Sequence, residues 1–235
     1  MLTKVFSTVA PLYYIFVLWW DYTYVDLSSF MVIKAKQDEF FKGRLKFLTM
    51  WNMFLQATFF TICLLNNYVG TDEINPKTKP LIRKIRDLIL AALAFPLSLY
   101  VGVTFWSIYA VDRELIFPKA LDPFFPSWLN HAMHTNIMFF IFIQVCSSYH
   151  EYPSRKAGIA ILSAFMFTYL VWINILHAYT GVWVYPVLEV LNFPVRLVFF
   201  AISLGIGILL YIIGEKLNSF LWSSTVEKDK RKKHN

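Results

Sequence analysis

The residues best suited to chemistry are hydroxyl, amide and imidazole side chains that interrupt three otherwise apolar segments. The first segment holds Thr49, Asn52 and Gln56, the second Asn130, His131, His134, Thr135 and Asn136, and the third Asn174 and His177. Spacings of three and seven residues place the first set on one face of a helix, and a spacing of three does the same for the third set. In the second set, His134 lies one turn from Asn130 and almost one turn from His131. Because polar groups are costly in apolar surroundings, these sets are the first place to look for a functional site.

A hydroxyl beside an imidazole can act as a nucleophile, because the histidine accepts its proton. Thr49 and His134 could supply such a pair. The apolar segments hold no Asp or Glu beside His134, so the group that orients it would be an amide, for instance Asn130 or Asn52. Spacing alone leaves Thr135 as an equally acceptable nucleophile.

The same polar residues allow three other interpretations, of which two involve a metal and one is purely structural. His131, His134 and His177 match the ligand count of a catalytic zinc site, although no carboxylate is evident to orient them. His134 and His177 could alternatively bind one haem between facing helices. Polar side chains in membranes also often bond helices together, at about 0.6–2 kcal/mol each. The gathering of all three sets in one region favours a functional site over this structural role.

The composition places these side chains in a membrane protein. The chain has 235 residues, of which 57% are hydrophobic, 19% aromatic and only 16% charged. Its mean hydropathy is +0.51. An ordinary soluble domain would carry about 25% charged residues. The net charge of +7 does not indicate nucleic-acid binding, because the basic residues fall between the apolar blocks and in the tail.

Six apolar blocks are long enough to cross a bilayer, which takes about 20 helical residues. The fold class predicted is an all-α integral membrane protein of six transmembrane helices within residues 1–222. The expected spans are residues 5–20, 46–69, 88–111, 127–148, 157–180 and 192–222. Pro96 lies inside the third span and predicts a kink packed against neighbouring helices. Gly205 and Gly207 in the last span offer a thin surface for close helix approach.

The charge distribution predicts the orientation of these spans. The amino terminus, the loops 70–87 and 149–156 and the carboxyl-terminal tail together hold most of the 22 Lys and Arg residues. The positive-inside rule therefore predicts that both termini lie in the cytosol. The second and fourth spans then begin, and the fifth ends, on the outer or lumenal side. All three polar sets would fall in that leaflet and form a one-sided pocket.

Residues 223–235 form a short basic tail that is predicted to be cytosolic. Lys232 and Lys233 are the fourth and third residues from the end, an arrangement similar to the dilysine retrieval signal of endoplasmic reticulum membrane proteins. The signal implies coat-protein recognition and residence in the endoplasmic reticulum membrane, with the plasma membrane as the alternative. The tail could equally be a charge run attracted to anionic lipid headgroups.

Several stretches of the sequence resemble the androgen-induced protein family. The longest runs over Pro126 and from Trp128 to Thr135, and includes both His131 and His134. The other matching stretches, which together cover roughly residues 43–222 in consistent order, are Lys46–Thr49, Gln56–Ala57, Phe105–Trp106, Asp112–Glu114, Tyr152–Arg155 and Thr180–Pro186.

The resemblance implies a six-span membrane hydrolase that cleaves fatty acid esters of hydroxy fatty acids with a Thr–His dyad. The family threonine falls on Thr49 and its catalytic histidine on His134, and no metal or other cofactor is implied. Ala132 stands where mammalian members of the family have glycine, and its methyl group would narrow the pocket. The first 42 residues match poorly, and the sequence assigns no role to residues 21–42.

The function expected is therefore a metal-independent membrane esterase whose lipid substrate enters sideways from the bilayer. Side chains expected to bind or orient the substrate are Asn52, Gln56, Asn130, His131, Asn174 and His177. The alternatives are a histidine-ligated zinc hydrolase, a transporter and a non-enzymatic scaffold. A transporter would need a polar path through both leaflets, and Gln144 alone continues that path poorly.

Overall fold

A computed structural model describes residues 2–25 and 40–234 of the chain. These residues form helices joined by loops and contain no strand, so the all-helical fold class is confirmed. The α-helices are α1 (Leu2–Tyr24), α2 (Leu48–Val69), α3 (Leu81–Ile89), α4 (Phe95–Val111), α5 (Ser127–His134), α6 (Asn136–Ser147), α7 (Arg155–Thr180), α8 (Pro186–Val190) and α9 (Phe193–His234). A π-helix, η2 (Leu90–Ala94), joins α3 to α4, and short 3-10 helices are η1 (Phe40–Lys46), η3 (Arg113–Leu115) and η4 (Lys119–Leu121).

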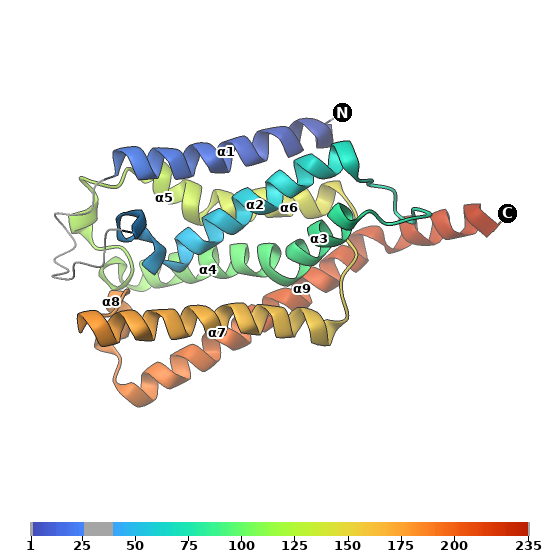
Figure 1. The fold of residues 1–235 in the computed structure, drawn as a ribbon. Helices are drawn as coiled ribbons and strands as arrows, with labels where there is room; N and C mark the ends of the chain where they lie inside the picture. Colours follow the sequence, from blue (N-terminus) through green and yellow to red (C-terminus); the bar gives the residue numbers. More distant parts are fainter. Residues whose placement is uncertain (1, 26–39, 235) are drawn as a thin grey trace.

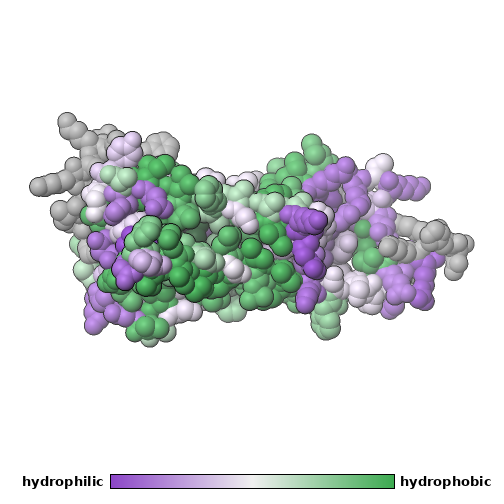
Figure 2. Space-filling model, turned by 90° about the horizontal axis from the view of Figure 1, so that it is seen from below, coloured by the Kyte–Doolittle hydropathy of each residue, from purple (hydrophilic) through white to green (hydrophobic). Residues whose placement is uncertain are grey.

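The long helices run along one axis as an elongated bundle (Figure 1). The start of α1 and the end of α9 lie at the same end of this bundle, together with the loops 70–80 and 148–154. We call this the terminal end. The opposite end carries η1, α8 and the loop 112–126, and we call it the site end. A surface view shows an apolar belt between the polar residues at the two ends (Figure 2).

Four helical segments are long and apolar enough to cross a membrane: Leu48–Val69, Leu81–Val111, Arg155–Thr180 and Phe193–Asp229. They correspond to the second, third, fifth and sixth predicted spans. The predicted fourth span is divided at Thr135 into α5 and α6, which are 8 and 12 residues long. The six-span prediction is thus confirmed only in part.

The first predicted span forms α1, a helix of 23 residues. Its buried side chains recur at helical spacing, since Ala10, Tyr14 and Val17 are all fully enclosed. Tyr14 stacks on Phe60 of α2 with ring centroids 5.4 Å apart. The amide of Asn67 donates to the Ser7 hydroxyl at 2.8 Å. This buried stripe places α1 against α2 along the bundle.

Near Pro96, where the sequence predicts a kink, the structure has the π-helix η2, which ends two residues before the proline. A proline lacks an N–H and clashes with the preceding turn, and a π-turn widens the helix there. The amide of Gln56 on α2 donates to the Ala94 carbonyl at 3.1 Å. A side chain from a neighbouring helix thus satisfies a backbone carbonyl at the irregular turn.

Helix α9 continues without a break from Phe193 to His234. The residues expected to form a separate tail after residue 222 therefore extend the last helix beyond the bundle (Figure 1). The side chains of Lys232 and Lys233, on which the retrieval-signal prediction depends, lie outside the described residues.

Candidate active site

Thr49 occupies the first turn of α2 at the site end, where its side chain is half-buried. The N–H of the preceding residue, Leu48, donates to the hydroxyls of Tyr169 and Tyr185, at 2.9 Å in each case. Tyr169 also donates to the Lys46 carbonyl at 2.9 Å. Two tyrosines from other parts of the chain therefore fix the start of α2, and with it the Thr49 hydroxyl.

His134 is the last residue of α5 and is buried. Its Nε2 lies 3.1 Å from the Thr49 hydroxyl oxygen. Its Nδ1 lies 3.0 Å from the Asn130 backbone carbonyl and 2.8 Å from the Asn130 side-chain oxygen. Because both of these oxygens are acceptors, we assign the ring proton to Nδ1. Nε2 then carries a lone pair, so the Thr49 hydroxyl donates the hydrogen bond between the two side chains.

The imidazole plane is held by an aromatic ring on α4. Phe105 stacks on His134 with ring centroids 3.6 Å apart and an interplanar angle of 13°. Two hydrogen bonds on one edge and a ring against one face leave His134 little freedom to rotate. The arrangement has the geometry of a nucleophile and a general base oriented by a third residue.

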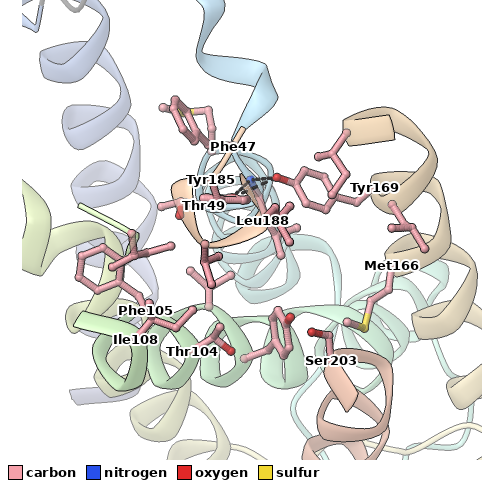
Figure 3. A pocket seen from close by; sticks show the side chains of 18 of the residues that line it. Phe47, Thr49, Thr104, Phe105, Ile108, Met166, Tyr169, Tyr185, Leu188 and Ser203 are labelled. Carbon is pink, nitrogen blue, oxygen red and sulfur yellow. Dashed lines mark hydrogen bonds between the residues drawn. The ribbon is translucent and has the colours of Figure 1, made fainter. Parts of the chain in front are cut away.

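The Thr–His pair lies in the wall of a cavity of about 480 Å³. Its lining is predominantly aromatic and aliphatic, with side chains from α2, α4, α7, α8, α9 and the loop 112–126. Figure 3 shows Thr49 and Phe105 on one side of this space and Met166 and Ser203 on the other. A cavity of this size and character suits a largely hydrocarbon ligand.

Asn52 and Gln56, which were predicted to bind or orient the substrate, instead make contacts between α2 and η2. Asn52 and Gln56 are fully buried and do not line the cavity. The Gln56 amide donates to the Asn52 side-chain oxygen at 3.0 Å as well as to the Ala94 carbonyl. Because they lie deeper in α2 than Thr49, they support the packing of α2 on η2. The structure places neither of them where it would touch a ligand in the cavity.

The outer polar residues are also placed away from the cavity. His131 is exposed, and its Nδ1 lies 3.1 Å from the hydroxyl of Thr135, which accepts from the Trp106 indole at 3.0 Å. Asn174 is exposed and donates to a carbonyl of its own helix. His177 stacks on the Trp183 ring at 4.0 Å. None of these four polar side chains lines the cavity that holds Thr49.

The three histidines of the zinc hypothesis therefore do not meet. His134 faces Thr49, His131 faces Thr135, and His177 faces Trp183. Over residues 2–25 and 40–234, no three His, Cys, Asp or Glu side chains are grouped so as to hold one ion. The geometry brings together the dyad and not the proposed ligand set.

Sequence reasoning missed a second buried polar cluster at the terminal end. His150 Nδ1 lies 3.0 Å from an Asp87 carboxylate oxygen, and its Nε2 lies 2.9 Å from the Ser148 hydroxyl. Arg83 and Arg86 also bind this carboxylate, at 2.9 and 2.8 Å. The short spacing between Ser148 and His150 was the signal available, but nothing in the sequence linked it to Asp87.

The geometry of this cluster resembles a Ser–His–Asp arrangement, but the cluster is not accessible to a ligand. Ser148, His150 and Asp87 are buried, and none of them lines the cavity that holds Thr49. Burial and the nearby Arg86 guanidinium lower the pKa of His150 to about 4, against the opposing effect of Asp87. The Asn218 amide on α9 donates to the His150 carbonyl at 2.8 Å. The cluster therefore joins α3, the loop 148–154 and α9.

A buried ion pair at the site end was also missed. Arg44 Nε lies 2.6 Å from an Asp21 carboxylate oxygen, with both side chains almost fully enclosed. The Arg44 guanidinium also donates to the Asp21 and Val25 carbonyls. The pair ties η1 to the end of α1 and contributes to one wall of the cavity. Its two halves are 23 residues apart, so no local motif pointed to it.

The fold and the site define a helical membrane protein with a Thr–His pair in the wall of an apolar internal cavity. The chain belongs to the FAR-17a/AIG1-like protein family, whose match covers residues 7–219. The resemblance predicted from the sequence is thereby confirmed. The match begins at residue 7 and so includes most of the first 42 residues, which were expected to match poorly.

Relatives of this chain extend over nearly its whole length. It is 40% identical over 215 residues to the androgen-induced gene 1 protein of Homo sapiens, covering 88% of this chain and 90% of the relative. It is 38% identical over 226 residues to the androgen-dependent TFPI-regulating protein of Mesocricetus auratus, covering 94% and 96%. A membrane protein of Schizosaccharomyces pombe is 21% identical over 197 residues, covering 83% and 82%. No solved structure shows significant similarity to the chain.

Proposed function

We propose that this protein is a membrane-embedded esterase that hydrolyses fatty acid esters of hydroxy fatty acids, with Thr49 as nucleophile and His134 as general base. The observation that carries the proposal is the 3.1 Å contact between the Thr49 hydroxyl and His134 Nε2 in the wall of an apolar cavity. The resemblance of the Lys46–Thr49 and Trp128–Thr135 stretches to the androgen-induced protein family supplies the substrate class.

The first half of the reaction transfers the acyl group to the enzyme. Thr49 Oγ attacks the ester carbonyl while its proton moves to His134 Nε2, and the Asn130 oxygens stabilise the imidazolium through Nδ1–H. When the tetrahedral intermediate collapses, the ester C–O bond breaks. His134 returns the proton to the departing oxygen, which leaves as the free hydroxy fatty acid.

The second half frees the enzyme. A water molecule attacks the acyl-threonine carbonyl and gives its proton to His134. The bond to Thr49 Oγ then breaks, the proton returns to Thr49, and the fatty acid leaves. No metal or other cofactor takes part in either half.

The start of α2 supplies the charge stabilisation that such a reaction needs. Within the described residues, the Thr49 backbone N–H makes no hydrogen bond, because it lies in the first turn of the helix. A helix N-terminus carries a partial positive charge that favours a developing oxyanion. The sequence alone does not assign the oxyanion donors, and Asn52, Asn130 and His131 are the candidates by position. None of these three side chains lines the cavity, so we assign the role to the Thr49 amide.

The proposal includes an orientation in the membrane. α1 and the α5–α6 pair would complete six crossings, with both termini in the cytosol and the site end toward the lumen. The chain termini lie at one end of the bundle, as an even number of crossings requires (Figure 1). If Lys232 and Lys233 act as a retrieval signal, the protein resides in the endoplasmic reticulum, and the site end faces the lumen of that organelle. A carboxyl-terminal tag should be reached by antibody when only the plasma membrane is permeabilised, and detection only after full permeabilisation would reverse the orientation.

The experiment that tests the activity uses the full chain purified in mild detergent. Wild type should hydrolyse a fatty acid ester of a hydroxy fatty acid and be labelled by a fluorophosphonate probe. The Thr49→Ala and His134→Ala variants should lose both signals. Labelling of a folded Thr49→Ala protein at the wild-type level would move the nucleophile elsewhere.

A further inference from the structure

Helices α7 and α9 are pressed together over the part of their length nearer the terminal end. A Cβ added at Gly207 of α9 would lie 2.7 Å from the sulfur of Met166 on α7. A Cβ at Gly158 of α7 would collide with the Tyr211 ring of α9. These glycines therefore fix the crossing of the two helices, as Gly207 was predicted to do. Gly205 has no neighbouring atom within 4 Å and takes no part.

From this crossing toward the site end the two helices diverge (Figure 1). The cavity that holds Thr49 extends into the space between them. Its lining includes Met166 and Phe167 from α7, and Ala201 and Ser203 from α9. Phe167 is 65% exposed, and Ala201 is exposed as well, so this part of the lining reaches the outer surface of the bundle. The cavity is thus open sideways between α7 and α9.

The depth and chemistry of this opening determine what can pass through it. Ala201 lies eight residues after the start of α9, which corresponds to about 12 Å along the helix. The surrounding surface belongs to the apolar belt (Figure 2). No charged side chain of α7 or α9 lines the cavity. In the membrane orientation proposed above, a point at this depth lies within the hydrocarbon layer, which is about 30 Å thick in a typical bilayer.

We propose that the opening between α7 and α9 is a lateral portal through which an acyl chain passes from the bilayer into the cavity. The portal is bounded by Met166, Phe167, Ala201 and Ser203, and Figure 3 shows Met166 and Ser203 directed toward the cavity. The occupant is the acyl chain of a membrane-dissolved lipid, because hydrocarbon gains nothing from a route through the charged residues of the site end. The inference rests on the proposed function in one respect only, namely that the acyl chain brings its ester group to Thr49.

A binding experiment tests the portal without depending on catalysis. The full-length Thr49→Ala protein in phosphatidylcholine liposomes is irradiated with a 16-carbon fatty acid that carries a mid-chain diazirine, with and without excess unlabelled fatty acid. Labelling that the competitor suppresses should map to residues 163–170 and 197–204. Suppressible labelling confined to the loop 112–126 would place entry at the site end and overturn the proposal.

A matched pair of variants tests the same portal by obstruction. Ala201→Trp places an indole at the opening, whereas Ile202→Trp adds a similar bulk at an exposed position that does not line the cavity. Ala201→Trp should reduce suppressible labelling at least fivefold, and Ile202→Trp should leave it within twofold of its Thr49→Ala parent. Equal labelling of the two variants, with both eluting as folded protein, would contradict the portal.

Turnover separates the portal from the proposed activity. In the otherwise wild-type chain, Ala201→Trp should lower hydrolysis of a long-chain ester in liposomes at least tenfold but change hydrolysis of p-nitrophenyl acetate less than twofold. Equal losses on both esters would mean that the substitution damages the dyad and would count against a portal. If wild type hydrolyses neither ester, the proposed function fails, and the labelling experiment still decides the portal.

Discussion

Gly102 of α4 lies directly against the backbone carbonyl of His134. A Cβ built on Gly102 would stand 2.6 Å from that oxygen and equally close to the sulfur of Met138. His134 is the last residue of α5, and the helix is interrupted at Thr135. The His134 carbonyl therefore belongs to the turn between α5 and α6. The absence of a side chain at Gly102 thus allows α4 to approach the backbone of His134 closely.

Gly102→Ala should therefore move His134 and impair catalysis. The added methyl meets backbone, which cannot yield as a flexible side chain would, and overpacking of this kind costs about 1–3 kcal/mol. A shift of about 1 Å in a catalytic group can lower the rate roughly 100-fold. The measurement is ester turnover together with the thermal unfolding midpoint in detergent.

Gly205→Ala is the matched control, because a Cβ there meets no atom within 4 Å. It should leave turnover within twofold of wild type. Equal turnover of Gly102→Ala and Gly205→Ala would show that the contact with the His134 carbonyl is unimportant.

Substitutions in the Thr49–His134 pair and in the Thr135–His131 pair should have very different effects on activity. Thr49→Ala should abolish hydrolysis at a cost in stability of about 1 kcal/mol, the value of one hydroxyl hydrogen bond. Thr135→Ala and His131→Ala should retain most of it, since that pair lies outside the cavity. Turnover and elution in mild detergent are measured for each variant.

Combining Thr49→Ala with His134→Ala should add little to the loss from either change. Residues that act as one catalytic unit lose nearly everything with the first removal. A multiplicative loss in the double variant would mean that the two side chains act independently.

Asn130 should orient the base without being essential. Asn130→Ala removes the 2.8 Å contact to His134 Nδ1 but leaves the 3.0 Å contact to the backbone carbonyl. The loss of one hydrogen bond, about 1 kcal/mol, predicts a fall in kcat of roughly fivefold to tenfold. Asn130→Asp retains an acceptor and should recover most of the rate. A loss as large as that of His134→Ala would make Asn130 indispensable.

Ester hydrolysis should also be independent of metal ions. Zinc catalysis depends on a bound ion that activates water, whereas the proposed mechanism transfers the Thr49 proton directly to His134. Prolonged incubation with a strong chelator, followed by turnover measurement, should leave the rate unchanged. Activity that disappeared and returned with added zinc would restore the metal hypothesis for His131, His134 and His177.

The sequence predicts those features that depend on local pattern. Apolar blocks identify the long helices, and the predicted order of the spans places Thr49 and His134 near the same end of the bundle. Spacing could not separate Thr49 from Thr135, because the choice depends on which face of α5 turns toward the cavity. That face is set by packing against α4, through Gly102 and Phe105.

Features that join distant segments could not be predicted from pattern. The break at Thr135 interrupts an apolar block that reads as one continuous helix. The Asp21–Arg44 pair and the contact between Asp87 and His150 span 23 and 63 residues. Such contacts arise when charged groups must be paired on burial, and burial is known only from the packed structure.

Acidification should destabilise the terminal end through His150. Burial and the neighbouring Arg86 hold the pKa of His150 at about 4, whereas an unfolded histidine has a pKa of about 6.5. Between these values the unfolded chain binds the proton and the folded chain does not. Stability from this residue is therefore complete above about pH 6.5 and is lost as the pH falls toward 4.

The thermal unfolding midpoint, measured in detergent from pH 4 to 8, should accordingly fall with acidification in wild type. His150→Gln removes the titrating group, so its midpoint should be lower at pH 8, where the contacts to Asp87 and Ser148 are lost, but should depend less on pH. His131→Gln, at an exposed position, is the control and should keep the wild-type slope. An unchanged slope in His150→Gln would assign the acid sensitivity to other groups.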